Sequence, residues 1–343
     1  MMEKELKTMK KLFLALLAAM LLLCACCAAS AVEYTVTSVT DCAQTESRYD
    51  RFYQSGETGP VVPGLAEGLV PQGICLLPGN EELLFAGYRS DQGSSALIAV
   101  DRKTGQITRQ VSLQYADGKT YTGHAGGVCA TDTDIYISNA HMLYRISLDA
   151  FRAVSGRGAC RFEQEIPVPV NASYCCFAEG VLWVGEFQYG GDYKTDVSHY
   201  VKTADGLQRA WTCGYIMNES QNFSAPDYIL SVTERIQGIT TLDGAIYLSQ
   251  SYGRRADSAL YKYENVLARE ADGTVELDGK AVPMWYLDSG CREDVLLCPP
   301  MSECLCTADG KILVLFESAA QTYMNPGNPS VNPMDRVFCL TDY

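Results

Sequence analysis

Short apolar strands separated by turns recur along the chain with a constant internal spacing. Five segments begin with such a strand, and each reaches a turn at the seventh residue after its start. The starts are Gln72, Gly126, Ser173, Gln237 and Glu303, and the residues seven positions later are Gly79, Thr133, Gly180, Gly244 and Gly310. Glycine at four of the five turns favours tight hairpins. The pattern therefore predicts five hairpins built on one plan.

Further apolar strands follow each hairpin and predict a four-stranded unit. We expect third strands at residues 96–101, 142–146, 199–202, 259–263 and 336–340, and fourth strands at 108–113, 162–168, 210–216 and 282–287. The fifth unit reaches Tyr343 before it has an outer strand. Residues 33–39 alternate Tyr, Thr and Val, so we expect them to supply that strand and cover the open edge. The alternative is a loose leader over residues 32–69, because residues 56–64 are rich in Gly and Pro.

The repeat predicts an all-β fold, a five-bladed β-propeller closed by an N-terminal strand. Successive starts lie 54, 47, 64 and 66 residues apart, and no strong helical pattern intervenes. Four-stranded units at such periods are typical of propeller blades. Six blades are an alternative, and unrelated hairpins in a sandwich are a weaker one because they would not share the seven-residue offset.

Cysteines occupy one equivalent position in four of the five units. Each lies three residues after its start, at Cys75, Cys129, Cys176 and Cys306. Inner strands of a propeller are crowded, and a free Cys behaves there as a small apolar side chain. We therefore expect buried thiols at these positions. Cys291 and Cys298 fall outside the inner strands and are the pair most open to a disulfide.

The first 31 residues have the pattern of an export signal. Lysines at positions 7, 10 and 11 precede an apolar run over residues 12–29, and the chain continues Ala29-Ser30-Ala31. We interpret residues 1–31 as a signal peptide, residues 32–343 as a single propeller domain, and the protein as secreted. Two alternatives are a retained membrane anchor and a cell-surface lipoprotein that carries its lipid on Cys26. No later apolar stretch reaches membrane length, so we expect no transmembrane helix in the mature chain.

The charge balance excludes one class of partner. The chain has 27 Lys and Arg against 41 Asp and Glu, for a net charge of −14. A surface this acidic repels phosphate backbones, so we expect no nucleic-acid partner.

Recognition residues gather in the loops expected on one face of the ring. In a propeller, the loops that enter the inner strands and those that join second to third strands surround the mouth of the central channel. Loops on a rigid scaffold commonly carry function, and Tyr and Arg favour buried recognition sites. We predict ligand contacts from Gln72, Tyr88, Arg89, His141, Glu186, Gln237, Tyr252 and Arg254. The two glutamines have an equally good structural interpretation, as partners of a neighbouring blade's backbone.

His124 and Glu303 are the candidate catalytic residues. His124 enters an inner strand within Gly-His-Ala-Gly-Gly, where small neighbours let other groups approach. Glu303 opens the fifth unit, and burial there would raise the pKa of its carboxyl toward the range that proton transfer requires. The alternatives are a structural hydrogen bond for His124, and an ion pair or contact with water for Glu303.

Part of the first unit resembles the first blade of the plant and bacterial glutamine cyclotransferases. The resemblance rests on Val-Pro-Gln-Gly-Ile at 70–74, on Ser-Ser-Ala-Leu-Ile-Ala-Val-Asp at 94–101 and on Lys-Thr-Gly-Gln-Ile at 103–107. It implies a five-bladed propeller. That family opens its second blade with Gly-Glu-Gly, whose Glu transfers protons, whereas this chain has Gly126-Gly127. The resemblance thus supports the fold more than the activity.

These observations favour a secreted propeller that binds a peptide, a glycan or a small molecule without catalysis. The alternative is a cyclotransferase, lyase or hydrolase that uses Glu303 and His124 as general acid and base. We expect no metal or other cofactor, because the inner-strand starts offer one carboxylate and two amides, too few oxygens for a hard cation. Neither a G-x-S-x-G nor an H-E-x-x-H motif occurs.

Overall fold

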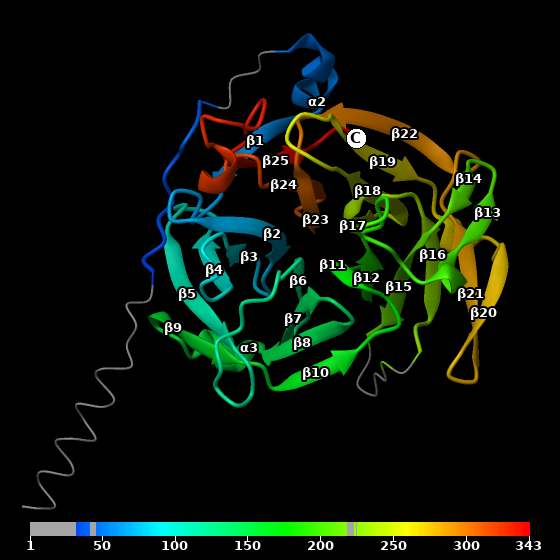
Figure 1. Cartoon of the computed structure of the whole chain (residues 1–343), viewed down its shortest axis with the longest axis horizontal. Coiled ribbons are helices and arrows are strands. Elements are labelled where there is room, and N and C mark those ends of the chain that lie inside the picture. Colours follow the sequence, from blue (N-terminus) through cyan, green and yellow to red (C-terminus); the bar gives the residue numbers. More distant parts are fainter. Residues whose placement is uncertain (1–31, 42–45, 218–222, 224) are drawn as a thin grey trace, which may run out of the picture. The chain divides into compact units, whose positions relative to one another are not determined.

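Five sheets stand around a common axis, one for each repeat in the sequence (Figure 1). Their inner strands are β2 (Leu69–Leu76), β6 (Gly127–Ala130), β11 (Ala172–Ala178), β17 (Ile236–Leu242) and β23 (Ser302–Ala308). Each inner strand packs against the inner strands of both neighbouring sheets, so the ring is complete. The chain is therefore a five-bladed β-propeller, as predicted, and neither six blades nor a sandwich is formed.

The computed structural model describes residues 32–41, 46–217, 223 and 225–343. All elements named here belong to the unit from Tyr34 to Tyr343. The expected export signal at 1–31, with Cys26, lies outside the described residues. Over the described ranges, no helix is long and apolar enough to span a membrane.

The first two blades follow the predicted strand order. Blade 1 contains β2, β3 (Glu82–Arg89), β4 (Ala96–Asp101) and β5 (Ile107–Gln114), and β9 (Gly156–Arg161) adds to its outer edge in parallel. Blade 2 contains β6, β7 (Asp134–Asn139), β8 (Met142–Ser147) and β10 (Gln164–Pro167). A short helix, α3 (Leu148–Arg152), follows β8.

Blades 3 and 4 depart from the predicted strand order. Blade 3 runs β11, β12 (Val181–Glu186), β15 (Ala210–Ile216), β16 (Tyr228–Val232), then β21 (Lys280–Tyr286) and β20 (Gly273–Leu277). Residues 210–216 thus form the third strand and not the fourth. Residues 199–202, expected as the third strand, lie in an insertion that folds on itself as the hairpin of β13 (Val201–Thr203) and β14 (Gly206–Gln208).

The segment expected as the outer strand of blade 4 belongs to blade 3 instead. Residues 282–286 lie within β21, which pairs in parallel with β16. Blade 4 contains β17, β18 (Ala245–Gln250), β19 (Ser258–Tyr263) and β22 (Arg292–Cys298). β21 and β22 are both strand-forming segments, and only the strands with which they pair distinguish them.

The outer strand of the fifth blade is β1 (Gly56–Val61), next to β25 (Arg336–Leu340), β24 (Lys311–Phe316) and β23. β1 pairs antiparallel with β25, with Thr58 opposite Phe338. The assignment of residues 33–39 to this position is therefore wrong, and so is the interpretation of residues 56–64 as a linker. Residues 34–40 form no strand; Tyr34 bonds the Gln110 side chain, and the Val39 amide donates to Asp335 at 2.7 Å. β1 can approach β25 closely because Gly56 has no side chain; a Cβ at this position would collide with the backbone of β25.

The hairpin turns have the geometry that the glycines predicted. Gly180, Gly244 and Gly310 adopt positive φ angles, and so does the residue before each of them. Two successive residues with positive φ define the turn that joins antiparallel strands with the least splay. In blades 3, 4 and 5 the seven-residue offset thus reflects one turn geometry repeated between inner and second strands.

The inner-strand cysteines are buried thiols, as predicted. The four at the repeated position are at most 6% exposed and unpaired: Cys75, Cys129, Cys176 and Cys306. Burial raises the pKa of each of these thiols. Cys291 and Cys298 are also buried and free, so the structure contains no disulfide between them.

Candidate functional site

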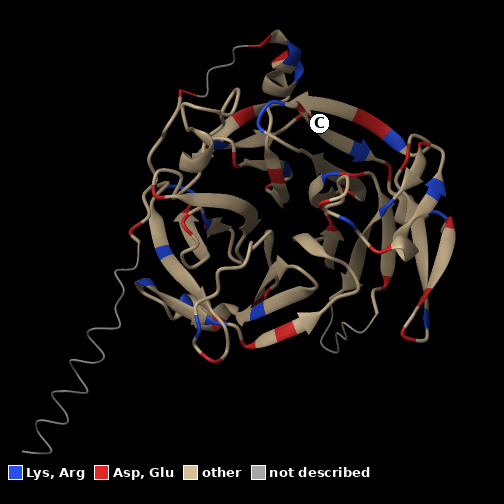
Figure 2. Cartoon of the chain, viewed as in Figure 1, with Lys and Arg blue, Asp and Glu red and all other residues tan. Residues whose placement is uncertain are grey.

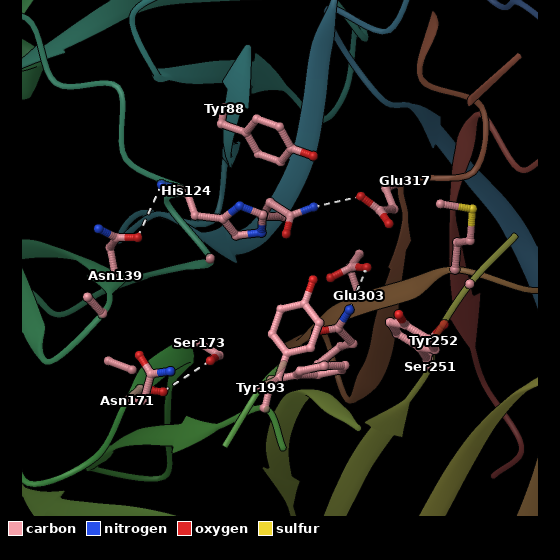
Figure 3. Close-up of a pocket in the computed structure, with 18 of the residues that line it drawn as sticks. Tyr88, His124, Asn139, Asn171, Ser173, Tyr193, Ser251, Tyr252, Glu303 and Glu317 are labelled. Atoms are coloured by element: carbon pink, nitrogen blue, oxygen red, sulfur yellow. Dashed lines mark hydrogen bonds between the residues drawn. The ribbon is translucent and has the colours of Figure 1, made fainter. Parts of the chain in front are cut away.

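A cavity of about 710 Å³ lies on the face where the inner strands begin. Its wall takes residues from all five blades, mostly from the starts of inner strands and the ends of second strands (Figure 3). The residues discussed below that line it are Gln72, Tyr88, His124, Asn139, Asn171, Ser173, Phe187, Tyr193, Gln237, Ser251, Tyr252, Arg254, Glu303, Glu317 and Tyr323. Charged residues elsewhere lie mainly on outer strands and loops (Figure 2).

Glu303 and Glu317 form an acid pair inside this cavity. Glu303 lies on β23 and Glu317 directly follows β24, the strand that pairs with it. The two carboxyls are within hydrogen-bonding reach of each other. Each also accepts a hydrogen bond from a glutamine of another blade: Gln237 Nε2 donates to Glu303 Oε1 at 3.0 Å, and Gln72 Nε2 donates to Glu317 Oε2 at 2.8 Å.

Burial and mutual repulsion keep a proton on the acid pair. Glu303 is 1% exposed, and burial followed by the neighbouring Glu317 raises the pKa of its carboxyl well above the usual 4.5. Burial also raises the pKa of Glu317, to about 7, against the lowering effect of its hydrogen bonds with Gln72 and Tyr323. Adjacent carboxyls in a poorly solvated site cannot both ionise easily. Near neutral pH the pair therefore holds at least one proton.

His124 and Tyr88 face the acid pair as a stacked pair of rings. Their ring centres are 4.5 Å apart and nearly parallel, and the Tyr88 hydroxyl lies 3.2 Å from that of Tyr323. The backbone amide of His124 donates to Asn139 Oδ1 at 3.1 Å, which fixes the loop before β6. Although His124 is exposed at the mouth, loss of water contact on its inner side lowers the pKa of the imidazole below the usual 6.5, so the ring is neutral at physiological pH.

Aromatic side chains make up much of the remaining wall. We call Tyr88, Phe187, Tyr193, Tyr252 and Tyr323 the aromatic wall. Phe187 contacts Tyr193 edge-on at 5.2 Å, and Tyr252 lies 6.0 Å from Phe187. Arg254 lies over the Tyr323 ring at 4.9 Å and donates to a backbone carbonyl at 2.6 Å. These contacts hold the wall in place without a ligand.

Seven of the ten candidate residues from the sequence line this one cavity. They are His124, Glu303, Gln72, Tyr88, Gln237, Tyr252 and Arg254. Arg89, His141 and Glu186 do not. Arg89 follows Tyr88 on a strand, so it faces the other way, where it pairs with Asp91 at 2.6 Å and reaches Tyr34. His141 lies in the exposed turn between β7 and β8.

Glu186 is buried in a hydrogen-bond network and does not line the cavity. It is 1% exposed and accepts hydrogen bonds from His199 Nδ1 at 2.9 Å and from the backbone amides of Asn171 and Trp211. The His199 ring stacks on Trp211 at 3.8 Å. This network anchors the insertion that brings Phe187 and Tyr193 to the cavity.

Several wall residues were not predicted, although the sequence contained a signal for them. The residue 13 or 14 positions after the start of a repeat lies at the end of the second strand or directly after it, and in four blades it lines the cavity. These residues are Asn139, Phe187, Ser251 and Glu317. Tyr193 and Tyr323 come from long insertions that follow no repeat. No group of three or more His, Cys, Asp or Glu in the described part of the chain is arranged to hold a metal ion.

Comparisons with known proteins add little to this picture. No family model matches the chain, and no curated protein does. Among solved structures, Myxococcus xanthus glutaminyl cyclase matches with 13% identity and a TM-score of 0.40, over 83% of this chain and 94% of that one. A putative oxidoreductase (glucose dehydrogenase) of Thermus thermophilus matches with 12% identity and a TM-score of 0.40, over 83% and 99%.

Kuenenia stuttgartiensis hydrazine synthase matches with 13% identity and a TM-score of 0.36 over 71% of this chain. The chain spans only 55% of that protein's matched chain. At these identities and TM-scores we draw no activity from the similarity. The sheets themselves establish the five-bladed propeller, and the cavity must be interpreted from its own residues.

Proposed function

We propose that this protein is a binding propeller that takes a small organic molecule in its axial cavity. The observation that carries the proposal is the cavity of about 710 Å³, in which a few polar groups converge opposite the aromatic wall. Pockets for small molecules usually combine an apolar, aromatic lining with a small number of fixed polar groups. Here the polar groups are the acid pair and its two glutamines.

The arrangement of the cavity supports tight contact at low entropic cost. Gln72 is 4% exposed and Glu303 1%, and both are held by hydrogen bonds before any ligand arrives. Groups fixed in advance lose little conformational freedom on binding. Tyr and Arg side chains at the mouth supply large contact areas together with directed polar atoms.

A fragment screen tests the proposal. Purified protein would be screened by ligand-observed NMR and thermal shift against amines, alcohols, carboxylates, monosaccharides and dipeptides. We expect some fragments to raise the melting temperature, since a ligand that binds only the folded state stabilises it. Y252A removes a wall residue that is 39% exposed and should weaken binding about fivefold, the size of one aromatic contact.

A matched variant controls for general effects of the substitution. L297A truncates an apolar side chain that is 45% exposed on β22, away from the cavity, and should bind like the parent protein. The proposal is overturned if no fragment binds, or if binding is unchanged in both Y252A and Q237A.

An enzyme remains the second candidate, and the acid pair is the observation that favours it. Two carboxyls with separated proton affinities can serve as an acid and a base in one site. In this version Glu303 would keep its proton and Glu317 would exchange one near pH 7. His124 would act only as an acceptor, because it is neutral at that pH.

Product analysis separates the two candidates. Fragments that bind would be incubated with the protein and recovered for mass spectrometry. A binding propeller returns them unchanged. Turnover that is lost in E317Q and retained in L297A would establish the enzyme.

We also propose that the chain is exported. The proposal rests on the basic, then apolar, then small-residue pattern of residues 1–31. N-terminal sequencing of protein from the culture medium and from the membrane fraction tests it. A start at Val32 in the medium supports secretion, whereas a lipid-modified Cys26 supports anchoring. An uncleaved N-terminus in the cytoplasm overturns the proposal.

A further inference from the structure

The charges around the acid pair do not balance two ionised carboxylates. Arg254 is a cation that acts on Glu317, and it lies over Tyr323 with its guanidinium bonded to the carbonyl oxygen of Asn328. The structure describes no ion pair between Arg254 and either glutamate. Two ionised carboxylates would therefore leave one negative charge uncompensated in a poorly solvated site, which is unfavourable.

The other groups that face the pair supply no positive charge at neutral pH. Gln72 and Gln237 are neutral donors. The titratable neighbours are the hydroxyls of Tyr88, Tyr193 and Tyr323, the thiol of Cys304 and the imidazole of His124. Burial raises the pKa values of Tyr88, Tyr323 and Cys304, and partial loss of water contact lowers that of His124, so all four are neutral at this pH. A proton on the pair is what restores the balance when the cavity has no ligand.

The aromatic wall lies around the same space. Figure 3 shows the carboxyls of Glu303 and Glu317 and the rings of Tyr88 and Tyr193 pointing into one cavity. Tyrosine faces attract cations through their ring electrons, most strongly where water is excluded. Carboxylates and aromatic faces around one pocket thus favour a positively charged group over a neutral or negative one.

We propose that the axial cavity selects ligands that carry a protonated amine, with the ammonium group at the acid pair and the organic part against the aromatic wall. The proposal rests on the binding function stated above and names its ligand class. In the free cavity a proton neutralises the negative charge of one carboxylate. In the complex the ammonium ion neutralises that charge instead. Binding of the amine therefore releases a proton from the pair to solvent, and no bond in the ligand changes.

Three probes of equal size and different charge test the proposal. They are phenethylamine, 2-phenylethanol and phenylacetate. A primary amine has a pKa of about 10, so phenethylamine stays protonated through pH 8. We expect phenethylamine to bind at least tenfold more tightly than 2-phenylethanol at pH 7.5, and phenylacetate to bind least. The affinity of phenethylamine should rise between pH 6 and pH 8, because the acid pair loses its proton over this range, while the affinity of the neutral alcohol stays constant.

Calorimetry and two variants complete the experiment. The binding heat of phenethylamine at pH 6.5, compared across buffers of different ionisation enthalpy, should show proton release. E317Q should lower phenethylamine affinity at pH 7.5 about tenfold and remove its pH dependence, with little effect on 2-phenylethanol. E276Q, which changes an exposed carboxylate on β20, should behave like the parent protein.

The outcomes separate this inference from the proposed function. Equal binding of the amine and the alcohol, or amine binding independent of pH, overturns the ammonium proposal and leaves the binding propeller standing. The same holds if none of the three probes binds while other fragments occupy the cavity. If no fragment of any charge binds, both proposals fail.

Discussion

Replacing Glu317 with glutamine should stabilise the protein at high pH and leave it nearly unchanged at low pH. The substitution keeps the size of the side chain and an oxygen that can accept the hydrogen bond from Gln72 Nε2. It removes the carboxylate whose ionisation is unfavourable beside Glu303. The effect on stability should therefore follow the charge of this group and not a change in packing.

The sign follows from the direction of the pKa shift. The carboxyl of Glu317 has a pKa raised from 4.5 to about 7 in the folded protein. Its stabilising contribution is thus fully present below pH 4.5 and is lost as the pH rises through about 7. Relative to the parent protein, E317Q should gain stability over that window and hold a constant advantage above pH 8.

The magnitude follows from the size of the shift. A rise from 4.5 to about 7 corresponds to about 3 kcal/mol at about 1.4 kcal/mol per pKa unit. Glu317 is only partly buried, so screening by solvent reduces this to about 2 kcal/mol. For a unit of this length, about 2 kcal/mol moves the melting temperature by about 3 °C.

Urea unfolding and calorimetry of parent and variant at half-unit steps from pH 4.5 to 8.5 provide the assay. The difference between the two proteins is the quantity of interest, because other groups titrate in both. Since the two carboxyls titrate together, the difference reports the acid pair as a whole. E276Q should follow the parent throughout. Parallel stability curves for E317Q and the parent across this range would refute the reasoning.

Three further predictions concern other parts of the fold. Desolvation in the cavity lowers the pKa of His124 below 6.5, so some stability should be lost as the pH falls below about 6.5. H124Q should reduce this loss in melting curves, and an NMR titration midpoint at or above 6.5 would contradict the prediction. G126A would place a methyl group 2.2 Å from a backbone oxygen of β11 and should cost about 2 kcal/mol in urea unfolding, whereas G191A, with open space around it, should cost little. Peptide mapping without reduction should recover Cys291 and Cys298 as separate thiols, and a linked peptide would contradict the structure.

The sequence predicted the parts of the fold that depend on neighbours along the chain. A hairpin needs only two short strands and a turn that accepts positive φ, and Asp243-Gly244 and Asp309-Gly310 contain that information locally. The buried cysteines followed from the same regularity, because equivalent positions in equivalent hairpins meet equivalent surroundings. The number of blades and most third strands could be predicted for this reason.

Strand pairing across long insertions could not be predicted in the same way. Residues 210–216 and 282–286 are both apolar and strand-forming, yet one is the third strand of blade 3 and the other lies beyond its fourth. The closing strand shows the same limit. Residues 33–39 have the better strand composition, but β1 pairs with β25 because its glycine permits close approach to that backbone.

The candidate site likewise contains residues that the repeat predicted and residues that only tertiary contacts bring together. Residues at the starts of inner strands, such as Gln72, Gln237 and Glu303, were expected at the mouth from the repeat alone, because the repeat fixes which face they occupy. Glu317 was not among the candidate residues from the sequence. Only the tertiary structure brings it against Glu303 and the Gln72 side chain of another blade, where loss of water and a like charge change its proton affinity. Desolvation and charge coupling depend on neighbours far apart in the chain, so residue order alone could not determine them.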